Sequence, residues 1–117
     1  MEKEKQLSFH PRKDCPEMNR KANLIVEAAA QVYSVDPALL MSYSREKDDV
    51  NARHVAMYLC HARLDLSYKE IAASFHRSDF ASVMVTCQKV DQQRKTDPYY
   101  FLKADEVEFI LNGICNI

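Results

Sequence analysis

The chain has 117 residues, with 16 Lys and Arg against 17 Asp and Glu, four Cys, one Gly and no Trp. This length fits one domain, and 47% hydrophobic with 28% charged residues is typical of a folded globular protein. The single glycine argues against an all-β fold, whose tight hairpins need residues with positive φ. It also excludes a glycine-rich phosphate loop, so we expect no bound nucleotide. We expect no cofactor of another kind either.

The compartment is predicted from what the chain lacks. Its apolar runs fall well short of the roughly 20 residues of a membrane-spanning helix, so we expect no membrane partner. The N-terminal sequence MEKEKQLSFHPRKDCPE has no apolar core of the signal-peptide type. We therefore expect a cytoplasmic protein whose four widely spaced cysteines stay reduced.

Helical periodicity begins after an N-terminal arm, residues 1–16, that shows no regular pattern. A helix from about Glu17 to Tyr33 is predicted by apolar residues spaced three and four apart: Leu24, Ile25, Ala28, Ala29 and Val32. Asp36 and Pro37 form a helix start, which predicts a short helix to about Met41. The polar segment SYSREKDDVN that follows is interpreted as a loop.

The middle of the chain carries the most regular pattern. A helix from about Asn51 to Leu64 is predicted by the stripe Ala52, Val55, Ala56, Leu59 and Ala62. Ser67 and Glu70 form a capping box for a short helix that ends at Phe75. We expect a tight turn in which His76 or Arg77 is left-handed, with Ser78 as the cap of a helix to about Lys95. The buried stripe of that helix is predicted as Val83, Met84, Cys87 and Val90.

The last segment is acidic, with one basic and four acidic residues in 96–117 against nine and seven in 43–95. Asp97 and Pro98 predict a short turn before an amphipathic helix marked by Val107, Ile110, Leu111 and Ile114. This apolar stripe needs a partner surface, either its own core or a second copy, and we expect a homodimer through this helix. No strand pattern occurs. We predict an all-α fold with an arm at 1–16, a domain at 17–95 and a C-terminal extension at 96–117.

A short capped helix, a tight turn and a longer helix have the geometry of a helix-turn-helix, whose second helix can enter the major groove of DNA. Spacing alone does not separate this motif from an ordinary helical hairpin. The net charge of −1 gives little evidence for or against DNA binding, although nucleic-acid-binding domains usually carry a larger basic excess.

The stretch ARHVAMYLCHARLDLSYKEIAASFHRSDFASVMVTCQKV resembles the DNA-binding C-terminal domain of the bacterial replication initiator DnaA. That family reads RxxAMYL on its long helix, SLPEIG on the next helix and FGGRDHTTVLHAxxKI around its recognition helix. The match runs without gaps from Leu24 to Val90, and Arg53, Asp79 and Lys89 agree with it at positions outside the core. The resemblance implies a Trp repressor-like helix-turn-helix that binds double-stranded DNA.

The departures fall in the recognition motif, where the family's GGRDHTT is replaced by residues 76–82. The recognition Arg is Ser78 here, the His is Phe80 and the first Thr is Ala81. The resemblance therefore implies the fold and the groove geometry, whereas we expect a base specificity different from that of the family's replication-origin box.

Nine residues are candidate DNA contacts: Arg45, Arg53, Lys69, Arg77, Ser78, Asp79, Phe80, Ser82 and Lys89. The basic ones suit phosphates, and Arg45 and Arg53 resemble family arginines that approach the minor groove and the backbone. Asp79 can accept from a cytosine amino group, Phe80 can touch a thymine methyl, and Ser82 can bond to phosphate or base. Each also has an ordinary structural alternative: a solvated charge, a helix-dipole carboxylate, a core plug at Phe80 or a backbone bond from Ser82.

Catalytic and metal sites have little support in the sequence. His54 and His61 lie seven residues apart with Cys60 between them, but no second pair at ligand spacing exists. Cys60 and Cys87 fall among apolar helix positions, where cysteine is usually a small core residue. We therefore expect neither an enzyme nor a metal site.

Two functions remain open. The first is a small DNA-binding regulator of transcription or replication with altered base specificity, which we favour because Arg45, Arg53, Lys69, Arg77 and Lys89 are basic. The alternative is a helical protein-interaction module of the same fold that has lost specific DNA binding and uses its acidic C-terminal segment.

Overall fold

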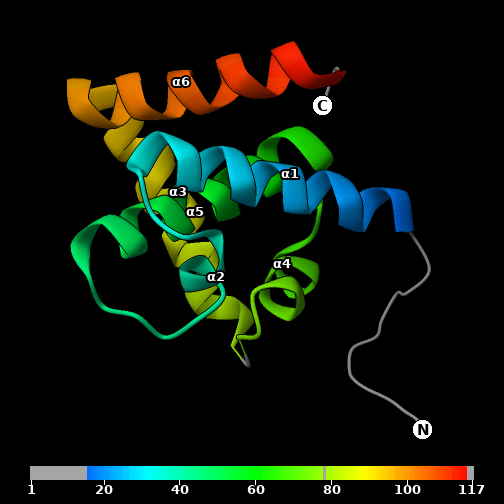
Figure 1. Cartoon of the computed structure of the whole chain (residues 1–117). Helices are drawn as coiled ribbons and strands as arrows, with labels where there is room; N and C mark the ends of the chain where they lie inside the picture. The colour runs from blue at the N-terminus through cyan, green and yellow to red at the C-terminus, as the bar shows by residue number, and fades with distance from the viewer. Residues whose placement is uncertain (1–15, 78, 116–117) are drawn as a thin grey trace, which may run out of the picture.

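The structure is a computed structural model that describes residues 16–77 and 79–115, with side chains for residues 20–77 and 79–113. All regular secondary structure in these residues is helical, which confirms the predicted all-α fold. The helices, drawn in Figure 1, are α1 (Pro16–Tyr33), α2 (Pro37–Leu40), α3 (Lys47–Leu64), α4 (Tyr68–Ser74), α5 (Phe80–Thr96) and α6 (Pro98–Cys115).

Three helix starts differ from their predictions. Helix α3 begins at Lys47, one turn earlier than expected, because Asp48 and Asp49 in its first turn stabilise the positive end of the helix dipole. Helix α5 is capped by Asp79 and not by the expected Ser78, which lies outside the described residues. Helix α6 runs unbroken from Pro98, because the Asp97 carboxylate accepts from the Tyr99 N–H at 3.0 Å and starts the helix directly.

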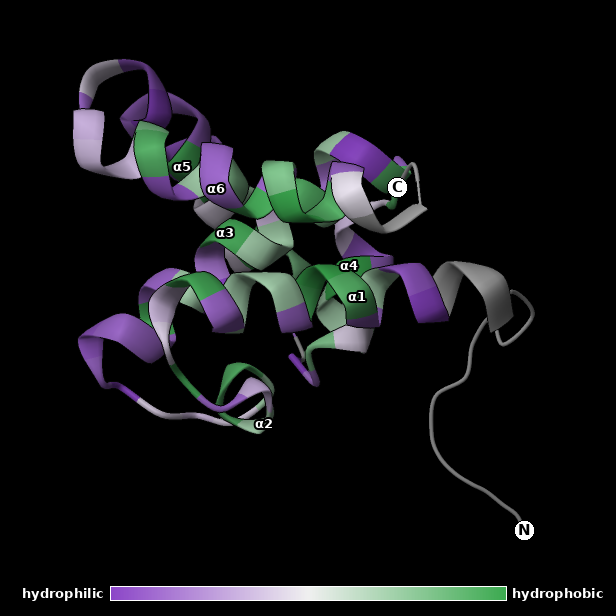
Figure 2. Cartoon of the chain, turned by 45° about the horizontal axis from the view of Figure 1, so that its top comes forward, coloured by the Kyte–Doolittle hydropathy of each residue, from purple (hydrophilic) through white to green (hydrophobic). Residues whose placement is uncertain are grey.

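Helix α3 forms the centre of the fold and packs between α1 and α5. Its buried stripe, Ala52, Val55, Ala56 and Leu59, meets Ile25 and Ala29 of α1 in one hydrophobic core together with Val83, Cys87 and Val90 of α5. Met84, predicted as buried, is only half-buried. In Figure 2 the segment that leads from α2 into the start of α3 is hydrophilic, whereas hydrophobic residues concentrate where α1, α3 and α6 face one another.

Three helices end at a left-handed residue that is not glycine. Ser34, Asp65 and His76, each with φ of 58°, follow α1, α3 and α4. A left-handed non-glycine residue costs about 1–2 kcal/mol, so the packing of the helices it joins must offset that cost. His76 is the residue that bends the chain between α4 and α5, which confirms one of the two positions predicted for this turn.

The C-terminal helix α6 packs against both α1 and α5. Its side chains Ala104, Val107 and Leu111 are fully buried in the common core, and Ile110 is half-buried against it. The partner surface predicted for this stripe is therefore present within the chain itself. Ile114, the fourth residue of the predicted stripe, has a side chain outside the described residues. Helices α1 and α6 run antiparallel: the end of α1 lies beside the start of α6 in Figure 1. At that end the Lys103 ammonium lies 5.5 Å from the centre of the Tyr33 ring.

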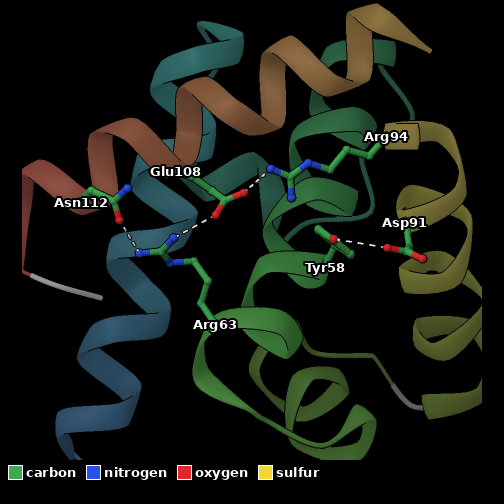
Figure 3. Close-up of polar contacts among 6 residues, drawn as sticks. All are labelled: Tyr58, Arg63, Asp91, Arg94, Glu108 and Asn112. Atoms are coloured by element: carbon green, nitrogen blue, oxygen red, sulfur yellow. Dashed lines mark hydrogen bonds and ion pairs between the residues drawn. The ribbon is translucent and has the colours of Figure 1, made fainter. Parts of the chain in front are cut away.

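One carboxylate joins α6 to the two helices beneath it (Figure 3). Glu108 accepts hydrogen bonds from Arg63 of α3, at 2.9 Å, and from Arg94 of α5. Arg63 also donates to the Asn112 side-chain oxygen at 2.7 Å. The Glu108 carboxylate thus separates two guanidinium groups that would otherwise repel each other.

Replacing this carboxylate should loosen α6. We expect Glu108→Gln to lower the free energy of unfolding by about 1–2 kcal/mol, because charge-assisted bonds to two arginines are lost and the two cations face each other. Urea unfolding followed by circular dichroism measures the change. Glu106→Gln, at an exposed position of the same helix, is the matched control and should leave stability unchanged. Equal stability of the two variants would show that Glu108 does not hold the helix.

Candidate nucleic-acid interface

Helices α4 and α5 form a helix-turn-helix whose first helix is fixed by the predicted capping box. The Ser67 hydroxyl accepts from the Glu70 N–H at 3.1 Å, and the Glu70 carboxylate accepts from the Ser67 N–H at 2.8 Å. Ile71, Ala72 and Phe75 bury the inner face of α4 in the core. These contacts determine the position from which the turn leads into α5.

The turn places the first residues of α5 at the surface. After left-handed His76, the Arg77 N–H returns to the Ala72 carbonyl at 2.7 Å and closes the end of α4. The Asp79 side chain then caps α5 by accepting from the Ala81 N–H at 2.9 Å. Phe80, Ala81 and Ser82 follow it and are all exposed.

Arg53, a predicted DNA contact, lies buried under the loop of residues 41–46. Its Nε donates to the Leu40 carbonyl at 2.9 Å, and its Nη2 donates to the carbonyls of Ser42 and Ser44 at 3.1 and 3.0 Å. The Asp49 carboxylate, one turn earlier on α3, accepts from the Ser44 hydroxyl at 2.6 Å. The guanidinium therefore holds the loop in place, and the expectation that it reaches phosphate has no support in these contacts.

Tyr43 and Arg77 join this loop to the helix-turn-helix. The Tyr43 hydroxyl donates to the His76 carbonyl at 3.1 Å, and Arg77 donates to the Ser42 carbonyl at 2.7 Å. The Arg77 guanidinium also lies 4.6 Å from the centre of the Tyr43 ring, a cation–π contact. Loop and turn are thus held together by both side chains, although Tyr43 is 75% exposed.

A groove of about 530 Å³ lies between the loop, α3 and α5. Arg45, Arg53, His54, Arg77 and Ser82 are among the residues that line it. Burial, together with the charges of Arg53, Lys89 and Arg77, lowers the pKa of His54 to about 4. Three cationic side chains, those of Arg45, Arg53 and Arg77, give the groove a positive charge, as suits a site that accepts an anion. His54 stays neutral there at pH 7, mainly because it is buried.

The remaining candidates lie around the exposed side of α5. Lys89 and Ser82 are exposed there, and the Ser82 hydroxyl donates to the Asp79 carbonyl at 3.0 Å. Phe80 is 45% exposed, so its core alternative is wrong. Exposed Lys69 of α4 places its ammonium 5.7 Å from the centre of the Phe80 ring.

The structure thus gathers most of the predicted site residues on one side. Arg45 and Arg77 line the groove with Ser82, while Lys69, Asp79, Phe80 and Lys89 lie along the helix-turn-helix. Two members of this surface, Tyr43 and His54, were not among the residues predicted from the sequence. An aromatic residue within a polar loop was the available signal for Tyr43, whereas nothing in the local sequence distinguishes His54 from any other helix histidine.

The cysteine and histidine side chains considered for catalysis or metal binding are buried or bonded to other groups of the chain. Burial raises the pKa of Cys60 to about 12 and that of Cys87 to about 11, so neither thiol ionises near neutral pH. His61 is held by the Leu66 carbonyl at 2.9 Å and stacks on Tyr68. In the described part of the chain, no three His, Cys, Asp or Glu side chains are placed to hold a metal ion. No helix there is long and apolar enough to cross a membrane.

The low pKa of His54 makes a prediction about acid stability. Because folding lowers this pKa below its ordinary value of about 6.5, the unfolded chain binds the proton more tightly. The stability gained from neutral His54 is therefore complete above about pH 6.5 and is lost as the pH falls toward 4.

Urea unfolding of the wild type and of His54→Gln at a series of pH values measures this contribution. We expect the stability of the wild type to fall more steeply than that of the variant between neutral pH and pH 4, since Gln does not titrate. Parallel profiles would show that His54 is not held neutral by its surroundings.

Comparisons with known proteins agree with this geometry. Residues 22–90 match the family described as bacterial dnaA protein helix-turn-helix. The chromosomal replication initiator protein DnaA of Pelobacter propionicus is 32% identical over 88 residues, covering 75% of this chain and 20% of that protein. DnaA 1 of Chlamydia muridarum is 38% identical over 77 residues, covering 62% of this chain and 17% of that protein.

The fold has a solved counterpart. A crystal structure of a DNA replication initiation factor superimposes with a TM-score of 0.72 at 31% identity, covering 84% of this chain and 30% of that one. The chain spans about a fifth of the length of the curated relatives it matches. With the family match over most of the folded region and the helix-turn-helix geometry, the chain belongs to the bacterial DnaA helix-turn-helix family, whose domain binds DNA.

Proposed function

We propose that this chain binds double-stranded DNA as a small regulator of transcription or replication, with a base specificity that differs from that of the DnaA box. The observation that carries the proposal is the arrangement of α5 beside the positively charged groove. The exposed first half of α5 is the part of a recognition helix that contacts base edges. The groove next to it is lined by Arg45 and Arg77.

In this proposal the phosphate contacts come from the exposed cations. Lys89 on α5, Lys69 on α4 and Arg45 on the loop are exposed and can reach a DNA backbone on either side of the recognition helix. Arg53 and Arg77 contribute mainly by holding the loop, because their guanidinium groups already bond to backbone carbonyls. Binding and positioning, without a chemical step, is the activity we propose.

The altered specificity follows from the recognition motif. Phe80 carries no hydrogen-bonding group in its side chain, and Ala81 has only a methyl group, where the family has His and Thr. Each specific base contact is worth about 1–3 kcal/mol of discrimination, so their loss brings binding to the replication-origin box close to the non-specific level. Ser78, the third replaced position, lies outside the described residues.

Exposed apolar residues on α6 favour protein interaction as a second function. Helix α6 leaves Phe101, Leu102 and Phe109 exposed on its outer side, with Phe109 79% exposed. Such residues can contact a protein partner or a second copy of the chain, which is the protein-interaction alternative. We rank it second because Val107 and Leu111, the residues first expected at a dimer interface, are buried within the chain.

Titration of a duplex at several salt concentrations tests DNA binding. The logarithm of the affinity should fall linearly with the logarithm of salt concentration, because phosphate contacts release counterions. Lys89→Ala should weaken binding to all sequences about equally and flatten this slope by about one unit. Fluorescence anisotropy of a labelled duplex measures both quantities.

Lys95→Ala is the matched control, since Lys95 lies on the last turn of the same helix and pairs with Asp91 at 3.3 Å. It should leave the slope unchanged. Absence of binding at low salt, or an affinity that does not respond to salt, would contradict DNA binding and favour the protein-interaction function.

A further inference from the structure

We propose that α5 recognises its DNA mainly through the C5 methyl groups of pyrimidines, those of thymine and 5-methylcytosine. The inference rests on the proposed DNA binding and names the chemical feature that this helix reads. Its basis is a set of exposed apolar residues on the first half of α5, namely Phe80, Ala81 and Val85, which we call the methyl-reading surface.

The methyl-reading surface is apolar where a soluble helix is normally polar. Val85 is 57% exposed and Phe80 is 45% exposed. Val85 lies on the side of the helix away from the buried residues Val83, Cys87 and Val90, whereas Phe80 lies beside them at the start of the helix. Ala81 and Val85 lie four residues apart and are therefore neighbours on the helix surface. Contact with a thymine methyl group in the major groove accounts for apolar side chains at these exposed positions.

The polar groups of the first turn are engaged in the backbone of the helix. One oxygen of the Asp79 carboxylate caps α5, and the Ser82 hydroxyl donates to the Asp79 carbonyl. The negative charge of Asp79 also repels the two acceptor atoms that guanine presents in the major groove. Residues 79–85 thus include no side chain that can donate two hydrogen bonds to one base, as Arg does to guanine. Apolar contact is the main way in which these residues can recognise a base.

Lys69 holds one side of this surface in place. Its ammonium lies 5.7 Å from the centre of the Phe80 ring, so α4 restrains the ring by a cation–π contact. A restrained ring loses little side-chain entropy when it packs against a methyl group. The same ammonium adds a positive charge at the edge of the surface, where the phosphates of a bound duplex would run.

The test compares one short mixed-sequence duplex in three forms: unmodified, with deoxyuridine in place of thymidine, and with 5-methyldeoxycytidine in place of deoxycytidine. These substitutions remove or add C5 methyl groups and leave base pairing unchanged. We expect deoxyuridine to weaken binding about fourfold for each methyl group that the helix buries, and added methyl groups to strengthen it by a similar factor. Fluorescence anisotropy at fixed salt measures the affinities.

Variants separate direct contact from changes in DNA shape. Val85→Ala keeps a good helix former and should reduce the ratio between the thymidine and deoxyuridine duplexes, since part of the methyl-reading surface is removed. Phe109→Ala removes an exposed apolar residue from α6 and should leave that ratio unchanged.

The possible results separate a failure of methyl recognition from a failure of DNA binding. Salt-dependent binding that ignores methyl groups, or a methyl effect that Val85→Ala leaves unchanged, would overturn methyl recognition while DNA binding stands. Failure to bind any of the three duplexes at low salt would overturn the proposed function itself.

Discussion

A single buried cation, the guanidinium of Arg53, organises the segment on which the candidate interface depends. Helix α2 has only four residues, and the loop of residues 41–46 has no regular hydrogen bonding of its own beyond local turns. Arg53 donates from α3 to the carbonyls that this segment leaves unpaired, at the end of α2 and along the loop. Bonds from a charged donor are worth about 1.5–3 kcal/mol, enough to keep so short a segment in one conformation.

From this attachment the loop becomes one surface with the helix-turn-helix. Tyr43 and Arg77 bridge the loop and the α4–α5 turn, so the recognition helix and Arg45 are placed relative to each other by fixed contacts. A surface arranged in advance loses less entropy on binding than one ordered by its ligand. Arg77 thus joins the loop to the turn by a hydrogen bond and a cation–π contact.

Helix α6, which the family match does not include, packs against α1 and α5. The Glu108 carboxylate between Arg63 and Arg94 fixes this helix against α3 and α5. Helix α6 thereby covers core residues of α1 and α5, and it supports the recognition helix from behind without facing the groove. The exposed aromatic residues of α6 leave a second surface for a partner on that side of the molecule.

Much of the fold could be predicted because its signals are local. The capping box at Ser67 and the Asp36–Pro37 helix start both depend on residues within one turn of each other, and the apolar stripe of α3 depends on simple periodicity. The role of Arg53 could not be predicted, since its acceptors lie 9 to 13 residues away along the chain. The exposure of Phe80 was equally inaccessible, because a helical stripe alone does not show where the core ends.

We propose that residues 42–45 and the first half of α5 form one DNA-binding face. An NMR titration of the isotopically labelled chain with a short duplex tests this arrangement, because each backbone amide reports its own surroundings. We expect the amide signals of the loop, including those of Tyr43 and Arg45, to shift together with those of Ala81 to Lys89 at the same DNA concentration, while those around Phe109 stay in place. Shifts confined to α6, or to α5 with the loop unaffected, would contradict it.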